Sequence, residues 1–283
     1  FMPRDEDFDA DSSSPAKGGG NKFNAKVVIP IIIVLVLVVF VLIQMDVFTN
    51  MSTEQMMVKK GATVLVIGAP SPYLLTELTN VENKDLVSQV RVLTPQDLRY
   101  NPNAILKQYD IIILDQTMSS SQAVTRQLAN AIKDQVKWGK DLIVVGNSGI
   151  YREGANGLID VSVIGWKGNF GNLVPVGCDN TTFGVPSCLD AMNVNGRIIA
   201  RNADHPIMLG IQKVPALDIN PPLKATVYPV QIEGKEIAMF QDIKGHTYPG
   251  IVEKTFLLGK VIYFNYDPGL APAVFENTLN YLQ

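Results

Sequence analysis

The sequence predicts an α/β fold: a parallel sheet with flanking helices, extended by further strands and preceded by one N-terminal transmembrane helix. Three observations lead to this prediction. A long apolar run precedes a much longer globular sequence, short β-branched runs then alternate with helical patterns, and shorter strand-like runs fill the remainder. Alternation of strands with helices favours parallel strands joined by right-handed crossovers, with helices on both faces of the sheet.

The apolar run covers residues 27–43 and is flanked by Lys26 and Asp46. A helix rises about 1.5 Å per residue, so the uncharged stretch between these two residues can cross most of a hydrocarbon core about 30 Å thick. No small-residue cleavage site follows the run, which favours an uncleaved anchor over a signal peptide. We therefore predict a transmembrane helix over residues 26–46, with the lipid bilayer as its partner.

The distribution of basic residues around the run predicts its orientation. Lys17, Lys22 and Lys26 precede the run, whereas Asp46 follows it and Lys59 is the first basic residue beyond it. Lysine and arginine collect on the cytoplasmic side of membrane helices. The N-terminus is therefore predicted to be cytoplasmic, and the C-terminal domain to lie outside the cytoplasm at the cell membrane.

Composition divides the rest of the chain. Residues 1–25 are acidic and rich in serine and glycine, which predicts a disordered cytoplasmic tail. Residues 47–61 form a polar stalk, and residues 62–283 suffice for one large α/β domain, with a loop-rich excursion over residues 146–190. The net charge of −3 gives no indication of a nucleic-acid partner.

The first half of the domain shows strands and helices in alternation. Short apolar runs bounded by glycine or polar residues are typical of buried strands, and apolar residues spaced at four are typical of helices. The predicted strands are residues 63–67, 90–93, 111–115 and 142–145, and the predicted helices are residues 70–78, 97–106 and 123–138. After the excursion we expect shorter strands and a closing helix at residues 197–200, 225–228, 236–240, 251–256, 260–264 and 273–282. These later strands are compatible with an antiparallel extension of the same sheet.

Cys178 and Cys188 are the only cysteines, and they lie close together in the Gly- and Asn-rich excursion. In an oxidising compartment such a pair is more typical of a disulfide than of a metal site, the alternative being two free buried thiols. Asn50 and Asn180 each begin an N-glycosylation acceptor triplet. These features agree with an extracytoplasmic domain.

Four segments resemble the class I glutamine amidotransferase-like superfamily: residues 109–115, 136–146, 205–210 and 259–264. More narrowly, they are similar to its non-catalytic, membrane-anchored branch, which includes gliding-motility ABC-transporter auxiliary proteins and a non-catalytic oligosaccharyltransferase subunit. The resemblance covers about residues 62–283. It implies a flavodoxin-like parallel sheet and a non-catalytic role in a protein complex.

The turn after the fourth strand tests whether the domain is an enzyme. Active relatives carry a nucleophilic cysteine there, whereas this chain has Ser148 and, two residues later, Ile150 where a tight elbow needs a small residue. The relatives' His-x-Glu pair is also missing, because His205 and His246 are the only histidines and neither begins that motif. We therefore expect no catalytic residues, with Ser148, His205 and His246 as weak candidates.

Other chemistry has less support in the sequence. No phosphate-binding loop or dinucleotide fingerprint is present, and the cysteines and histidines show no metal-ligand spacing, so no cofactor or metal is expected. Asp115, Asn147 and Asp267 follow or end predicted strands, where open α/β sheets bind ligands, and could face a crevice. The alternative is that the carboxylates accept hydrogen bonds from nearby backbone amides.

The function predicted from these observations is a membrane-anchored, non-catalytic binding or scaffolding subunit of an extracytoplasmic envelope complex. Its partners would be membrane or envelope proteins, or further copies of itself. One alternative is a surface hydrolase using Ser148. Another is a self-assembling structural subunit of a surface layer or filament.

Overall fold

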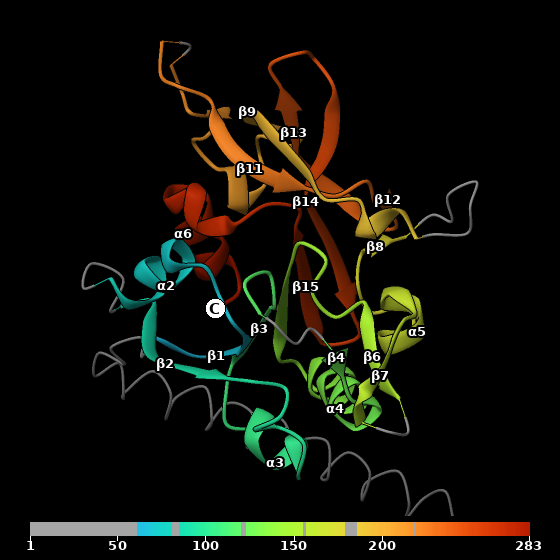
Figure 1. Ribbon diagram of the computed structural model, residues 1–283. Helices are drawn as coiled ribbons and strands as arrows, with labels where there is room; N and C mark the ends of the chain where they lie inside the picture. Colours follow the sequence, from blue (N-terminus) through green and yellow to red (C-terminus); the bar gives the residue numbers. More distant parts are fainter. Residues whose placement is uncertain (1–60, 81–84, 120–122, 155–156, 179–185, 218) are drawn as a thin grey trace, which may run out of the picture. The chain divides into compact units, whose positions relative to one another are not determined.

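The computed structural model describes residues 61–80, 85–119, 123–154, 157–178, 186–217 and 219–283 (Figure 1). These residues belong to one compact unit, Lys59–Gln283. The predicted tail, the predicted transmembrane helix and the acceptor residues Asn50 and Asn180 lie outside the described residues. Within the described ranges, no helix is long and apolar enough to cross a membrane.

The first half of the unit alternates strands and helices, as predicted. Its elements are β1 (Ala62–Gly68), α2 (Pro72–Thr79), β2 (Val87–Leu93), α3 (Pro102–Leu106), β3 (Ile111–Asp115), α4 (Arg126–Lys137) and β5 (Asp141–Val145). Helix α2 is capped by the Ser71 hydroxyl and α4 by the Thr125 hydroxyl, each of which accepts a backbone amide of the first turn. Helix α3 is shorter than predicted because Pro102 fixes its start.

The region predicted as a loop-rich excursion contains short regular elements. These are β6 (Tyr151–Gly154), β7 (Gly157–Val163), α5 (Gly165–Phe170), β8 (Val176–Gly177) and the 3₁₀ turn η2 (Ser187–Leu189). Strand β6 pairs with β7 and with β4 (Ala123–Val124), and β8 pairs with β12 (Gln231–Ile232). The predicted disulfide between Cys178 and Cys188 is present in this region.

The last part of the chain supplies mainly antiparallel strands and the closing helix. The elements are β9 (Met192–Ala200), η3 (Pro206–Met208), β10 (Lys213–Val214), β11 (Leu223–Val227), β13 (Lys235–Asp242), β14 (Thr247–Phe256), β15 (Gly259–Phe264), η4 (Pro268–Leu270) and α6 (Pro272–Tyr281). Strands β14 and β15 form a hairpin whose two-residue turn is Leu257 and Leu258.

The main sheet is mixed and has ten strands in the order β10-β9-β13-β14-β15-β5-β3-β1-β2, with β11 also paired to β9. Strands β2, β1, β3, β5 and β15 are parallel, whereas β14, β13, β9, β10 and β11 are joined by antiparallel pairs. The prediction of a flavodoxin-like parallel sheet is therefore wrong for the sheet as a whole. The β14–β15 hairpin reverses the strand direction, and the following strands continue the antiparallel pairing.

Two hydrophobic layers cover the parallel half, with α2 and α6 on one face and α4 on the other (Figure 1). Strand β3 shows the pattern most clearly, because Ile111 and Ile113 join one layer while Ile112 and Leu114 join the other. Burial of both faces explains why the parallel strands are continuously apolar.

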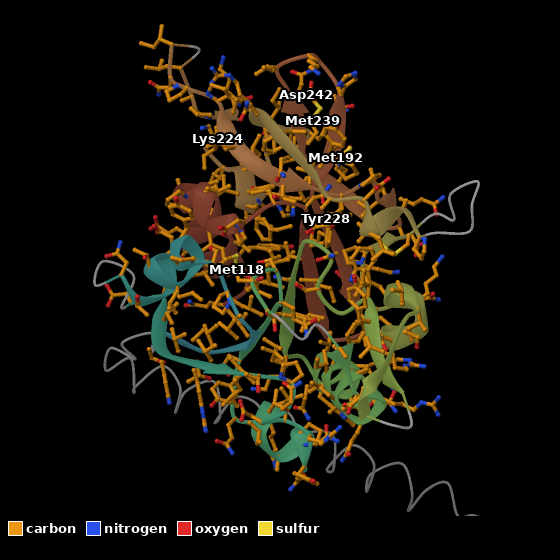
Figure 2. All side chains as sticks on the ribbon, in the orientation of Figure 1. Met118, Met192, Lys224, Tyr228, Met239 and Asp242 are labelled. Atoms are coloured by element: carbon orange, nitrogen blue, oxygen red, sulfur yellow. A yellow bond between two sulfur atoms is a disulfide. The ribbon has the colours of Figure 1, made fainter. Side chains whose placement is uncertain are left out.

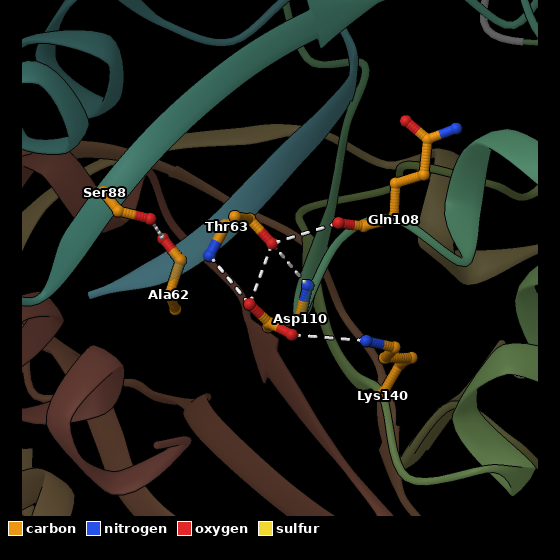
Figure 3. A network of polar contacts seen from close by, with 6 residues as sticks. All are labelled: Ala62, Thr63, Ser88, Gln108, Asp110 and Lys140. Carbon is orange, nitrogen blue, oxygen red and sulfur yellow. Dashed lines mark hydrogen bonds and ion pairs between the residues drawn. The ribbon is translucent and has the colours of Figure 1, made fainter. Parts of the chain in front are cut away.

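Hydrogen bonds connect β1 and β3 at the edge of the sheet where these strands begin (Figure 3). The Asp110 carboxylate accepts the amide and hydroxyl of Thr63 at 2.9 and 2.8 Å, and Lys140 lies 3.2 Å from its other oxygen. Burial acts to raise the pKa of Asp110, but the bonds from Thr63 and the charge of Lys140 lower it below its ordinary value. This network fixes the register between the first and third strands.

Candidate functional site

A crevice of about 330 Å³ lies at the carboxyl ends of the parallel strands. Its polar and aromatic lining residues come from the ends of β3 and β15, from the start of α2 and from β11. They are Ser71, Tyr73, Thr117, Lys224, Thr226, Tyr228, Tyr266 and Asp267. Figure 2 labels three of the lining residues: Met118, which follows β3, Lys224 in β11, and Tyr228, which directly follows β11. Ligand sites of open α/β sheets occupy this edge.

Asp115 ends β3 and lies behind the crevice without exposed surface. Its Oδ1 accepts the amide and the hydroxyl of Thr117 at 3.0 and 2.6 Å, and the backbone amide of Ser71 also interacts with the carboxylate. Burial, together with a smaller effect of the negative charge of Asp267, raises the pKa of this carboxyl to about 6, against the opposing effect of the Thr117 bonds. Asp115 therefore changes its charge close to neutral pH.

Asp267 is half-buried and lines the crevice directly. It caps η4, with its Oδ1 accepting the amide of Gly269 at 3.0 Å. A Cβ atom on Gly269 would lie 2.3 Å from the amide nitrogen of Leu74, so η4 packs closely against the start of α2. This contact holds the Asp267 carboxylate beside the N-terminal end of α2.

Tyr228 is placed by Asn265, a buried residue that follows β15. The Asn265 side chain accepts the amide of Tyr228 at 2.9 Å and donates to its carbonyl at 2.8 Å. Tyr263 adds a hydroxyl bond to the same Asn265 oxygen at 3.0 Å. At Gly146, where φ is +55°, a Cβ atom would lie 3.0 Å from the Tyr228 ring. The tyrosine backbone is therefore fixed, and its ring lies against the end of β5.

Tyr266 provides a second aromatic residue at the crevice. It is buried, and its hydroxyl has no hydrogen-bond partner in the described part of the chain. Burial and then the charge of Asp267 raise the pKa of this hydroxyl, so it stays protonated as a donor. The crevice thus combines hydroxyl donors, an ammonium group, carboxyl groups and aromatic rings.

Ser148 lies outside this crevice in a structural role. Its hydroxyl accepts the amide of Gln116 at 2.7 Å, and its carbonyl accepts the indole N–H of Trp166 at 2.8 Å. It is fully buried, and neither histidine is among its hydrogen-bond partners in the described part of the molecule. The arrangement provides no base for a serine nucleophile.

The two histidines bind carboxylates elsewhere. His205 is buried, with its Nε2 2.9 Å from Glu253, and burial lowers its pKa while Glu253 opposes that shift. His246 is exposed, with its Nδ1 2.9 Å from Asp242, which Figure 2 shows well apart from Met118. These residues do not form a common site.

Of the three residues predicted to face a crevice, Asp267 lines it and Asp115 lies next to it. Asn147 is buried, is not among the lining residues, and its Oδ1 has no hydrogen-bond partner among the described residues. Both carboxylates also accept backbone amides, as the alternative interpretation expected. Sequence reasoning missed Lys224 and Tyr228, because no local pattern relates these residues to the parallel strands. Among the described residues, no group of three potential ligands is placed to hold a metal ion.

Comparison with known proteins gives a fold and no family. No family model matches the chain. No curated protein sequence matches it either. Among solved structures, the cold-adapted β-galactosidase of Rahnella sp. R3 is similar with a TM-score of 0.51 and 12% identity, over 78% of this chain and 31% of that enzyme.

Two further structures show weaker similarity. The β-galactosidase of Bacillus circulans sp. alkalophilus has a TM-score of 0.48 and 14% identity, over 77% of this chain and 30% of its own. The carbohydrate deacetylase Agd3 has a TM-score of 0.40 and 14% identity, over 73% and 30%. The chain thus spans about a third of the length of the β-galactosidases it matches.

These findings correct several expectations. The β-galactosidase with a TM-score of 0.51 shares this fold, and it gives no support to the expected glutamine amidotransferase-like superfamily, so that expectation is wrong. We expected a non-catalytic envelope subunit, and a pseudoenzyme, because of the resemblance to that superfamily. Both predictions are therefore wrong as well. The self-assembling subunit also gains no support, and the buried position of Ser148 removes the basis of the serine hydrolase.

Proposed function

We propose that the chain is a glycan-processing enzyme, or a domain of one, that binds a sugar unit in the crevice at the carboxyl ends of the parallel strands. The observation that carries this proposal is the pair of carboxyl groups, Asp115 and Asp267, whose environments differ beside a crevice large enough for a small ligand. The fold shared with a β-galactosidase supports it.

The lining chemistry suits a sugar. Carboxylate oxygens accept bonds from sugar hydroxyls, while the Lys224 ammonium and the Thr226 hydroxyl donate to sugar oxygens. The ring of Tyr73, a residue that is 63% exposed, offers a flat apolar surface for the C–H face of a pyranose, with its hydroxyl group at the rim. Such a combination of aromatic faces and few polar groups is typical of small-molecule sites.

Asp267 is placed to take part in hydrolysis of a glycosidic bond. This reaction commonly uses carboxyl groups that face the substrate, and Asp267 is the carboxyl group that lines the crevice, with the buried Asp115 behind it. Asp267 lines the crevice, so it is the group that would exchange a proton with a sugar oxygen or an attacking water. Asp115 is a positioning residue, because it has no exposed surface and its charge acts on the site through Asp267.

Turnover of chromogenic galactosides and mannosides, and release of acetate from an acetylated glycan, test this proposal in the full chain. We expect Asp267→Asn to lower turnover by about 100-fold or more, as is usual for loss of a proton-transfer group. Asp204→Asn serves as the matched control, because Asp204 is exposed and does not line the crevice. Asp115→Asn should remove a step near pH 6 from the pH profile.

Two results would contradict the proposal. One is the absence of both turnover and sugar binding, the latter measured by saturation-transfer NMR with galactose and mannose. The other is an Asp267→Asn variant that keeps full activity while remaining folded.

A further inference from the structure

Three large apolar side chains lie together at the opposite edge of the sheet from the crevice. Trp138 follows α4, and Leu257 and Leu258 form the turn between β14 and β15. Their exposed fractions are 78%, 70% and 74%. The three residues, with Asp134 and Lys137, line one hollow of about 640 Å³. We call this surface the Trp138 patch.

The two turns that make the patch are packed against each other. A Cβ atom on Gly139 would lie 3.6 Å from the Cβ of Leu258, and one on Gly259 would lie 2.3 Å from the carbonyl of Lys140. The patch is therefore a fixed surface, built where the end of α4 meets the β14–β15 turn (Figure 1).

Leu257 occupies a position that normally favours glycine or asparagine. Its φ is +57°, in the left-handed region that β-turns of hairpins use. The fold gains little burial from Leu257, which is 70% exposed. A contact outside the described domain would account for an apolar side chain here.

The position of the start of β1 indicates what contacts the Leu257 side chain. Ala62, the first residue of β1, lines a second hollow of about 400 Å³ together with Trp138 and Lys140. The apolar run at residues 27–43 is separated from residue 61 by 17 residues, which reach at most about 60 Å when extended. We expect this apolar run to partition into lipid, and the connecting residues join it to the strand that begins at the same edge as the patch.

The charges around the patch favour an apolar mode of binding. Lys137 lies 3.3 Å from Asp134, and Lys140 lies 3.2 Å from Asp110. Because each cation has an acidic partner, the patch presents little net charge to anionic lipid headgroups. Tryptophan and leucine are the side chains that enter the interfacial region of a bilayer.

We propose that the Trp138 patch is a lipid-docking surface that inserts into the headgroup region of a bilayer. This contact would hold the domain with the N-terminal edge of its parallel strands at the membrane and the candidate crevice away from it. Because the apolar side chains drive the contact, it should form on zwitterionic lipid and depend little on salt.

Tryptophan fluorescence of the full chain in phosphatidylcholine vesicles tests the proposal. Trp166, the other tryptophan, is 1% exposed, so subtracting the signal of Trp138→Phe isolates Trp138. We expect acrylamide quenching of Trp138 in vesicles to be severalfold weaker than that of a fully exposed tryptophan, and lipids spin-labelled near the headgroup to quench it.

A double variant, Leu257→Asn with Leu258→Asn, should restore acrylamide access. Asparagine tolerates a positive φ, so the turn should keep its conformation, which circular dichroism can verify. The matched control is Leu209→Asn with Ile219→Asn, which changes two leucine-sized residues of 66% and 89% exposure away from the patch. This control should behave as the wild type.

Two outcomes would overturn the proposal. In the first, acrylamide quenches Trp138 in vesicles as strongly as it quenches a fully exposed tryptophan. In the second, Trp138 becomes protected in detergent as protein concentration rises, and lipid spin labels do not quench it. The second outcome would identify a second copy of the chain as the occupant of the patch.

Discussion

Replacing Asp115 by asparagine should change the pH dependence of stability. Burial, opposed by the bonds from Thr117 and reinforced by the charge of Asp267, raises the pKa of Asp115 from 3.8 to about 6 in the folded state. The folded protein therefore binds this proton more tightly than the unfolded chain does. Ionisation of Asp115 costs stability, which is lost between about pH 4 and pH 6 and stays lost at higher pH.

The size of this effect follows from the shift. A shift of about two units corresponds to about 3 kcal/mol at 1.36 kcal/mol per unit. Asparagine can keep both Thr117 bonds, because its amide oxygen can accept the Thr117 amide and hydroxyl in place of Oδ1. Since asparagine carries no charge, the variant should gain about 3 kcal/mol relative to the wild type between pH 4 and pH 7.5.

Thermal unfolding across this pH range measures the gain. For a domain of this size, 1 kcal/mol corresponds to about 2–4 °C, so the difference in Tm between variant and wild type should rise by about 6–12 °C. Asp204→Asn, at an exposed position, should give a flat difference. A difference for Asp115→Asn that stays flat, or that falls as pH rises, would refute the argument that this carboxyl is buried at a cost.

Three further changes test the packing. Gly68→Ala should lower the free energy of unfolding by more than about 3 kcal/mol, because φ is +124° and the new Cβ would lie 2.1 Å from a carbonyl oxygen of β3. A smaller loss of stability in urea unfolding would show that the strands move apart easily. Ser148→Ala should cost about 1–3 kcal/mol by removing the hydroxyl that accepts the buried Gln116 amide, and an unchanged urea midpoint would contradict this. Replacing Cys178 and Cys188 by serine should cost about 2–3 kcal/mol, and reduction of the wild type should lower the Tm equally; no change on reduction would argue against the bond.

The local patterns of the sequence predicted much of the parallel half. The run at residues 111–115 became β3 with the same bounds. Four consecutive apolar residues followed by an aspartate are typical of a short strand that is buried on both faces. The four-residue spacing of Leu128, Ile132 and Val136 became the buried face of α4. The position of Asp115 and Asp267 at strand ends also followed from the sequence.

The sequence by itself thus determined which segments of the parallel half are strands or helices, which of their faces are apolar, and where strand-end carboxylates fall. Only the tertiary structure decided that half of the main sheet is antiparallel, that Tyr228 and Lys224 line the crevice beside Asp267, and that Ser148 is buried. The physical reason is one of range. Periodicity reports the environment of each segment, whereas strand pairing and site assembly depend on packing between segments far apart in the chain.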